Sequence, residues 1–224
     1  AASLKDNDVL LQATLKLIDQ SPLGSGAGYG VPLPLDRAMT ASELGFARVQ
    51  ENPVYVQWSR GKFEATLVHS MGQILLDLNR VAADLIYFSM SEFGYFQLPP
   101  EMCTGSSIMP QKQNPDVLEL VRARYHLVAS CEYQLRMTLA NLPHGYHRDL
   151  QMTKEPTFRA IDATLETVAI MALVFGSLKV DRQRLQAAMS KELYATQEAY
   201  KLVTEEGMTF RDAYAKVKAQ LVKS

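Results

Sequence analysis

The stretch Val56–Phe88, VQWSRGKFEATLVHSMGQILLDLNRVAADLIYF, decides the fold class of this chain. Its large apolar side chains recur at steps of three and four residues: Phe63, Leu67, Met71, Ile74, Leu78, Val81, Leu85 and Phe88. This spacing places them on one face of an α-helix, and no proline interrupts the run. A helix of this length reaches about 50 Å, more than the width of a small domain. It therefore needs other helices of similar length to cover its apolar face, and His69 within it is expected to have a structural role.

Three further segments have the spacing of helices. Val9–Ile18 is the first. The second runs from Asp116 to about Leu142, where Pro143 ends it. Its predicted apolar side consists of Val117, Leu120, Val121, Val128 and Leu135. The third follows Pro156, and its predicted apolar side consists of Phe158, Ile161, Leu165, Val168 and Leu173.

The pattern changes to shorter helical pieces beyond Lys179. These are predicted at Asp181–Met189, Tyr194–Glu205 and Thr209–Val222. Gly207 separates the last two, and Thr209 is a suitable N-cap. No segment has a convincing strand pattern. The predicted fold is therefore all-α, with a long-helix bundle over residues 1–178 and a small C-terminal helical domain over residues 179–224.

Composition narrows the function classes. The 224 residues carry a formal net charge of −1 without a block of Lys or Arg, so neither nucleic acid nor a membrane surface is expected as a partner. The N-terminus lacks the pattern of a signal peptide, and the most apolar stretch, Val168–Phe175, is too short to span a bilayer. Cys103 and Cys131 have no metal-site spacing, and a disulfide between them remains a less favoured alternative. We expect a soluble, cytoplasmic protein.

Two long segments should be irregular. Ser21–Asp36 alternates glycine with other residues, and its backbone could approach an anion or simply pack closely. Gln97–Pro115 carries repeated prolines and contains the run GSSIMPQKQNP from Gly105 to Pro115. Lys112 and Asn114 lie two residues apart, so in an extended segment they share a face. A cation and an amide on one face suit a carboxylate ligand. The alternative is a surface loop with a solvated lysine.

The run from Gly105 to Pro115 resembles the signature of the fumarase/aspartase superfamily. Three other segments are similar to the argininosuccinate lyase family within it: Ser21–Gly30 with the following Asp36-Arg37, Tyr146–Pro156, and Gly207–Tyr214. The resemblance covers nearly all of this chain. The chain, however, covers only about the C-terminal half of the family's pattern.

The resemblance implies a lyase that cleaves argininosuccinate to arginine and fumarate by anti β-elimination. The resemblance also implies a role for each matching residue. Ser106 matches the catalytic base, Lys112 and Asn114 the residues that hold the fumarate-side carboxylate, and Glu119 a glutamate that orients a catalytic histidine. Ser107 matches a further substrate-binding residue. The residues that match contacts to argininosuccinate are Tyr146, Gln151 and Lys154. The resemblance also implies a homotetramer with sites shared between subunits, and we expect neither a metal nor a cofactor.

Several of these roles have a structural alternative. Ser106 and Ser107 could merely hydrogen-bond the loop to itself, and Glu119 could favour the helix dipole. His144 and His147 are not at catalytic positions of the family, and they are expected to be solvated loop residues.

The family's catalytic histidine lies in a segment upstream of everything in this chain. We therefore expect a C-terminal fragment with negligible activity alone. Another lyase of the superfamily remains possible, because those loops are alike and Gln111, where fumarases and aspartases usually have glycine, decides little. A non-enzymatic helical scaffold of the crystallin type and a helical interaction module are the remaining alternatives.

Overall fold

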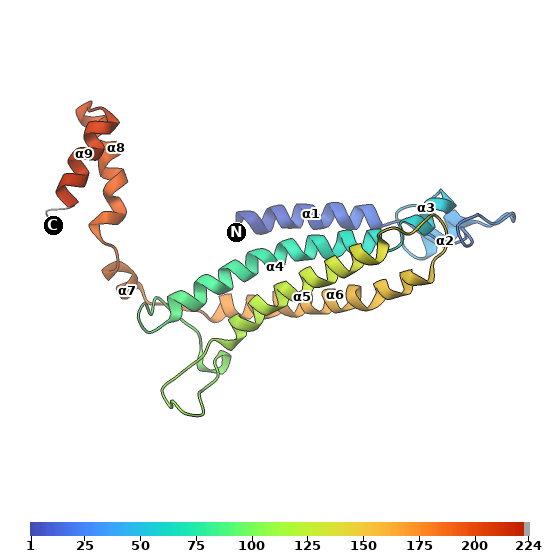
Figure 1. The fold of residues 1–224 in the computed structure, drawn as a ribbon, viewed down its shortest axis with the longest axis horizontal. Helices are drawn as coiled ribbons and strands as arrows, with labels where there is room; N and C mark the ends of the chain where they lie inside the picture. The colour runs from blue at the N-terminus through green and yellow to red at the C-terminus, as the bar shows by residue number, and fades with distance from the viewer. Residues whose placement is uncertain (222–224) are drawn as a thin grey trace. The chain divides into compact units, whose positions relative to one another are not determined.

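The computed structural model describes residues 1–221 and divides the chain into two compact units. The first unit comprises Ala1–Tyr87 and Leu98–Leu178. The second comprises Phe88–Gln97 and the described residues from Lys179 onward. Helices dominate both units, which confirms the all-α prediction (Figure 1).

Four long helices form the bundle of the first unit. They are α1 (Ala2–Ile18), α4 (Lys62–Ser89), α5 (Asp116–Leu139) and α6 (Lys154–Ser177). The short helices α2 (Arg37–Glu43) and α3 (Pro53–Trp58) lie together at one end of this bundle, as Figure 1 shows. Two 3₁₀ turns, η1 (Pro100–Met102) and η2 (Arg148–Thr153), precede α5 and α6.

The long helix predicted at Val56–Phe88 is interrupted near its start, so its predicted continuity was wrong. Helix α3 ends at Trp58 and α4 begins at Lys62. Between them Gly61 has φ +76°, and an added Cβ would lie 2.3 Å from Leu139 Cδ2. The chain therefore turns where only glycine fits against the end of α5. Such a contact between distant residues cannot be seen in a spacing pattern.

Other helix boundaries also moved. Helix α1 begins at Ala2 rather than Val9, and its Asn7 Nδ2 donates to Asp77 of α4 at 2.7 Å. Helix α5 ends at Leu139, before the predicted Leu142, because Ala140 is already extended and Asn141 has φ +65°. The backbone thus leaves the helix before Pro143 could stop it.

The core of the bundle lies where α4, α5 and α6 meet. Its fully buried members include Val68, Leu75, Val128, Cys131, Leu135 and Ala160. On α5, Val121, Val128 and Leu135 are buried as predicted, whereas Leu120 is 62% exposed.

Helix α6 buries a face that the sequence analysis did not select. Its buried residues are Pro156, Thr157, Ala160, Ala163, Thr164, Thr167, Met171 and Val174. The predicted apolar side was wrong for this chain by itself, since Phe158, Leu165 and Leu173 are each more than 60% exposed. Small residues let helices approach closely. The buried threonine hydroxyls remain satisfied, because Thr164 and Thr167 donate to the carbonyls four residues earlier at 2.7 and 2.6 Å.

One described segment, Arg148–Ser177, is long and apolar enough to cross a membrane by length and composition. One such segment is weak evidence, because a core helix passes the same test. Helix α6 contributes Ala160 and Ala163 to the core cluster with α4 and α5. We therefore interpret the segment as a helix of the bundle.

The second unit is built around a short strand pair and a helical hairpin. Strands β1 (Phe96–Gln97) and β2 (Lys179–Val180) pair antiparallel, with Phe96 opposite Val180. The chain continues as α7 (Arg182–Ala187), η3 (Lys191–Tyr194), α8 (Ala195–Glu206) and α9 (Phe210–Leu221). The predicted end of the last helix at Val222 lies outside the described residues.

The two residues that end α8 and begin α9 were predicted correctly. Gly207 ends α8 in the left-handed conformation, with φ +67°. Thr209 Oγ1 accepts from the Asp212 amide at 3.2 Å and so caps α9. Ala199, Ala213 and Val217 form the small core between the two helices.

Candidate active site

The signature loop is closed at its base by a pair of backbone hydrogen bonds. The Thr104 amide donates to the Asn114 carbonyl at 3.0 Å, and the Asn114 amide donates to the Thr104 carbonyl at 2.8 Å. The Thr104 hydroxyl also donates to the Asp116 carboxylate at the start of α5. Asn114 is therefore held at the base of the loop. Thr104 and Asp116 were not selected from the sequence, because only the closed loop brings them together.

Ser106 lies in a tight turn within this loop. Its Oγ accepts from the amides of Ile108 at 3.2 Å and Met109 at 3.1 Å. This is the self-bonding that the sequence analysis gave as the alternative to catalysis. The same two amides would also stabilise negative charge on Oγ, so the geometry is compatible with both roles.

Three further predicted residues, in the loop and at the start of α5, face solvent. Ser107, Lys112 and Glu119 are exposed, and Ile108 is 86% exposed. Within residues 1–221, Lys112 Nζ has no hydrogen bond or ion pair, so the structure does not join Lys112 to Ser106. A cation and a serine on one uncovered loop can bind a ligand only if other parts of a protein enclose it.

Cys103 immediately precedes the loop and is partly buried. Burial raises the pKa of its thiol, and the carboxylates of Asp116 and Glu101 raise it further. Both cysteines are free, so the alternative of a disulfide between Cys103 and Cys131 is not realised. A raised pKa keeps the Cys103 thiol protonated and therefore a poor nucleophile.

The other predicted site residues lie where α5 is connected to α6. Tyr146 is 47% exposed, and Gln151 in η2 and Lys154 at the start of α6 are also exposed. The Tyr146 ring lies beneath the Arg60 guanidinium, with 5.3 Å from Cζ to the ring centroid. Arg60 gave no signal in the sequence, because it appeared to be one polar residue inside a long helix.

The glycine-rich segment reaches the same end of the bundle. Gln57 of α3 donates to the Gly26 carbonyl at 3.5 Å, and an added Cβ on Gly28 would lie 2.9 Å from Gln57 Cγ. An added Cβ on Gly145 would lie 3.8 Å from the Tyr29 hydroxyl. These contacts favour the close-packing interpretation of Ser21–Asp36.

The two groups of predicted site residues are separated by the full length of α5. This helix has 24 residues, which corresponds to about 36 Å. Figure 1 shows the signature loop at one end of the bundle and α2 and α3 at the other. The predicted site residues thus form two separate groups, termed half-sites: Ser106, Lys112 and Asn114 in one, and Tyr146 and Lys154 in the other. No single substrate of metabolite size can touch both half-sites of one chain.

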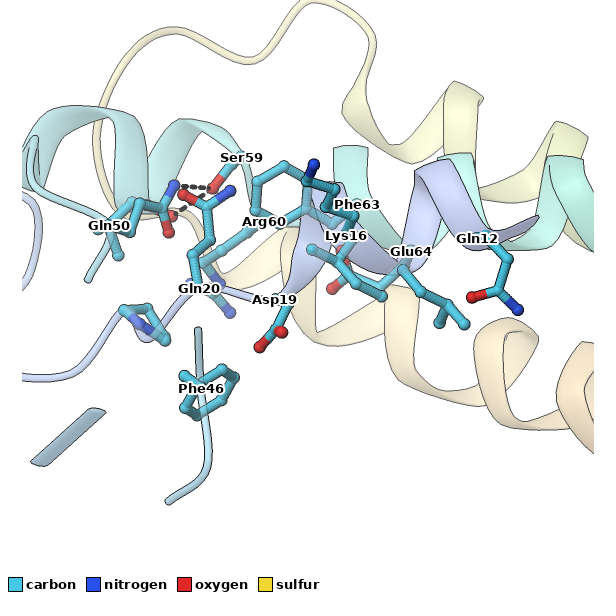
Figure 2. A pocket seen from close by; sticks show the side chains of 14 residues that line it. Gln12, Lys16, Asp19, Gln20, Phe46, Gln50, Ser59, Arg60, Phe63 and Glu64 are labelled. Carbon is cyan, nitrogen blue, oxygen red and sulfur yellow. Dashed lines mark hydrogen bonds between the residues drawn. The ribbon is translucent and has the colours of Figure 1, made fainter. Parts of the chain in front are cut away.

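A cavity of about 760 Å³ opens near the second half-site (Figure 2). It lies between the end of α1, the segment around Phe46 and the α3–α4 turn. Arg60 and Phe63 line it, and Gln50 Nε2 donates to Ser59 Oγ at 2.8 Å in its wall. This cavity is remote from Ser106 and Lys112, so its size alone does not make it the place of chemistry.

The histidines have structural contacts in this chain. His69 Nδ1 lies 3.2 Å from Glu132 Oε1. The His144 ring contacts the Trp58 ring in a tilted arrangement with centroids 4.3 Å apart, and His147 Nε2 lies 2.8 Å from the Pro143 carbonyl. The prediction that His144 and His147 are merely solvated was therefore incomplete.

Comparison with known proteins now bears on this arrangement. A family model described as "Lyase" matches residues 1–128. The chain belongs to this lyase family. Among its curated relatives in the family, the argininosuccinate lyase of Thermotoga neapolitana is 51% identical over 215 residues, covering 96% of this chain and 54% of the relative. That of Xanthomonas campestris pv. campestris is 45% identical over 214 residues, covering 96% and 49%. This lyase chain therefore spans about half the length of the curated relatives it matches.

Solved structures agree with the fold of the lyase family. EDDS lyase in complex with formate has a TM-score of 0.90 at 26% identity, with 97% of this chain and 43% of that chain covered. The class II fumarase of Schistosoma mansoni has a TM-score of 0.82 at 18% identity, with coverage of 100% and 51%. The second likeness concerns the fold alone.

Proposed function

We propose that this chain is part of an argininosuccinate lyase, which cleaves argininosuccinate to arginine and fumarate. Its curated relatives of that name support the proposal. The observation that carries it is the signature loop. In this loop Ser106 Oγ accepts hydrogen bonds from two backbone amides, and the same segment also presents Lys112 and Asn114. A solved EDDS lyase variant, 25% identical to this chain, contains bound fumarate, which supports fumarate as the product.

The proposed reaction is an anti β-elimination. Ser106 Oγ removes the proton from the carbon beside a carboxylate, and the electrons of that C–H bond form the double bond of fumarate. The C–N bond breaks, its electron pair goes to the guanidino nitrogen, and an acid protonates that nitrogen. Ser106 can act as this base only after its hydroxyl has lost its own proton. A free serine hydroxyl is far too weak an acid to lose that proton at neutral pH. The amides of Ile108 and Met109 would stabilise the alkoxide, and Lys112 would stabilise charge on the carboxylate.

The other predicted residues receive roles that follow from their place in the fold. Asn114, held at the loop base by Thr104, orients the fumarate-side carboxylate, and Ser107 adds a hydroxyl beside it. Glu119, on the exposed start of α5, orients a histidine supplied by another part of the protein.

The substrate's arginine half binds in the second half-site. Tyr146, Gln151 and Lys154 contact it there. No metal or cofactor is needed for the elimination, because the cations and amides supply the charge stabilisation.

We further propose that a complete site combines half-sites from different subunits of a homotetramer. The separation of the half-sites by about the length of α5 supports this. So does the exposed apolar row on α6, in which Phe158, Leu165, Val168 and Phe175 are 43–65% exposed. An apolar row of this size on a bundle helix is typical of a subunit contact. The enzyme is proposed to act in the cytoplasm.

The decisive experiment measures fumarate formation from argininosuccinate by ultraviolet absorbance. The full-length protein should turn over argininosuccinate, whereas this 224-residue chain alone should not. Adding the remaining half in trans tests complementation. Turnover of adenylosuccinate, aspartate or malate in place of argininosuccinate would refute the substrate assignment. Absence of any turnover by the full-length protein would favour a crystallin-like scaffold.

A further inference from the structure

The turn between α3 and α4 forms a platform for the loop that carries Tyr146. Two residues of the turn region each contact a ring of the loop. The Trp58 ring contacts the His144 ring at an interplanar angle of 49°, with centroids 4.3 Å apart. Arg60 Cζ lies 5.3 Å from the centroid of the Tyr146 ring. The two residues of the turn are two positions apart, and so are their two partners in the loop. The loop therefore runs alongside the turn.

The platform is fixed to the end of α5. Gly61 leaves room for Leu139 only because it lacks a side chain, since a Cβ would lie 2.3 Å from Leu139 Cδ2. The space that remains between turn and loop is a cavity of about 70 Å³, lined by Arg60 and Gly145 among others. The turn and the loop are therefore packed closely against each other.

The Arg60 guanidinium is also held by a hydrogen bond to Gln57. Its Nη1 donates to Gln57 Oε1 at 3.3 Å, and Gln57 Nε2 donates to the Gly26 carbonyl at 3.5 Å. A planar guanidinium can hydrogen-bond to an amide while it stacks on an aromatic ring, which an ammonium cannot do equally well. This series of contacts joins the glycine-rich segment to Tyr146 through Arg60.

We propose that Arg60 is a positioning residue that orients Tyr146 for the substrate. The inference rests on the proposed function, in which Tyr146 contacts the arginine half of argininosuccinate. Arg60 covers part of the Tyr146 ring and leaves 47% of the residue exposed for a ligand. It acts on binding at the half-site remote from Ser106. Its loss therefore changes KM and leaves the bond-breaking step nearly intact.

The first measurement uses this chain with ¹³C-labelled tyrosine. Arg60→Leu should move the NMR signal of the Tyr146 ring, which is assigned by its loss in Tyr146→Phe. The matched control is Lys62→Leu, because Lys62 Nζ lies 5.4 Å from the Tyr55 ring centroid in a similar contact that does not involve the loop. Lys62→Leu should move the Tyr55 signal and leave Tyr146 unchanged. Near-ultraviolet circular dichroism checks that each variant is folded.

The second measurement uses the full-length protein and separates positioning from a merely structural role. Arg60→Leu should raise KM for argininosuccinate about two- to fivefold, the range for an exposed cation–π contact, with kcat within about twofold. Arg60→Lys keeps the charge and should recover only part of the loss. In a Tyr146→Leu background, Arg60→Leu should have no further effect, because the ring it orients is gone.

Three results would overturn the inference. They are a Tyr146 signal that Arg60→Leu does not move, a KM that it does not change, and a KM effect that persists without the Tyr146 ring. A wild-type full-length protein without argininosuccinate turnover would instead refute the proposed function and the substrate part of the inference. The ring signals would still decide whether Arg60 holds Tyr146.

Discussion

Replacing Gly61 by alanine tests the central packing argument for the α3–α4 turn. Two costs combine at this position. A non-glycine residue with a left-handed φ costs about 1–2 kcal/mol, of which a less flexible unfolded chain returns about 0.4–1 kcal/mol. The Cβ would also lie 2.3 Å from Leu139 Cδ2 and 3.2 Å from Thr153 Cγ2, and overpacking of this kind costs about 1–3 kcal/mol. We expect Gly61→Ala to lower the free energy of unfolding by about 1.5–4 kcal/mol in total.

Gly45 supplies the matched control. Its φ of +78° is nearly that of Gly61, but an added Cβ would have no atom within 4 Å. Gly45→Ala should therefore cost only the backbone part, about 0.5–1 kcal/mol after the unfolded-state gain. Urea unfolding of the chain, followed by the fluorescence of its single tryptophan, Trp58, measures both, and Trp58 lies beside the turn under test. Equal losses in the two variants would refute the claim that contact with Leu139 selects glycine at position 61.

Three further predictions concern the site and the assembly. In the full-length protein, Ser106→Ala should lower kcat by about 10²–10⁴-fold, the range for loss of a general base, and Ser107→Ala should lower it less. Equal effects of the two substitutions in a fumarate-release assay would contradict the assignment of Ser106 as the base. Because burial and the Asp116 carboxylate raise the pKa of the Cys103 thiol, its alkylation by iodoacetamide should increase with pH only above the range of a free cysteine, and Asp116→Asn should shift that increase to lower pH. Mass spectrometry of the Cys103 peptide measures the alkylation, and a pH profile that Asp116→Asn does not shift would exclude Asp116 as a cause. Leu165→Glu, which puts a charge into the exposed row of α6, should reduce the mass of the full-length assembly in light scattering, and an unchanged mass would exclude this row as a subunit contact.

The long helices could be predicted from the sequence because their apolar residues repeat with the helical period. The break at Gly61 could not, because a single glycine is tolerated in many helices. What decides the matter here is the proximity of Leu139, which lies far along the chain. Local spacing contains no information about such a contact.

The packing face of α6 was not predictable from residue size. A search for the largest apolar side chains selects Phe158 and Leu165, which are exposed in this chain. The face that packs consists mainly of alanine and threonine, which permit close approach of helices. Thr167 can be buried there since its hydroxyl donates to the Ala163 carbonyl at 2.6 Å. The selected residues have the helical period of a contact face, but Phe158 and Leu165 remain largely exposed in this chain.

The candidate site likewise has some residues that a sequence motif reveals and others that only the folded structure reveals. A loop with a glycine, two serines and a lysine is visible as a sequence motif. The hydrogen bonds by which Thr104 closes it, and the contact of Arg60 with the Tyr146 ring, depend on how the backbone folds. Thr104 and Arg60 therefore became visible only in the structure.

The positions of the half-sites and of the exposed apolar row lead to the same physical requirement. A loop that presents Lys112 to solvent cannot stabilise a developing dianion well, since water screens the charge. It must be enclosed, and α5 keeps the Tyr146 half-site of the same chain about 36 Å away. Under the proposed function, another subunit or another part of the protein closes the loop. The row on α6 through Phe158 and Leu165 is the kind of surface by which such a polypeptide would be held alongside the bundle. Activity and assembly should consequently be lost together when that row is made polar, even though none of its side chains touches the substrate.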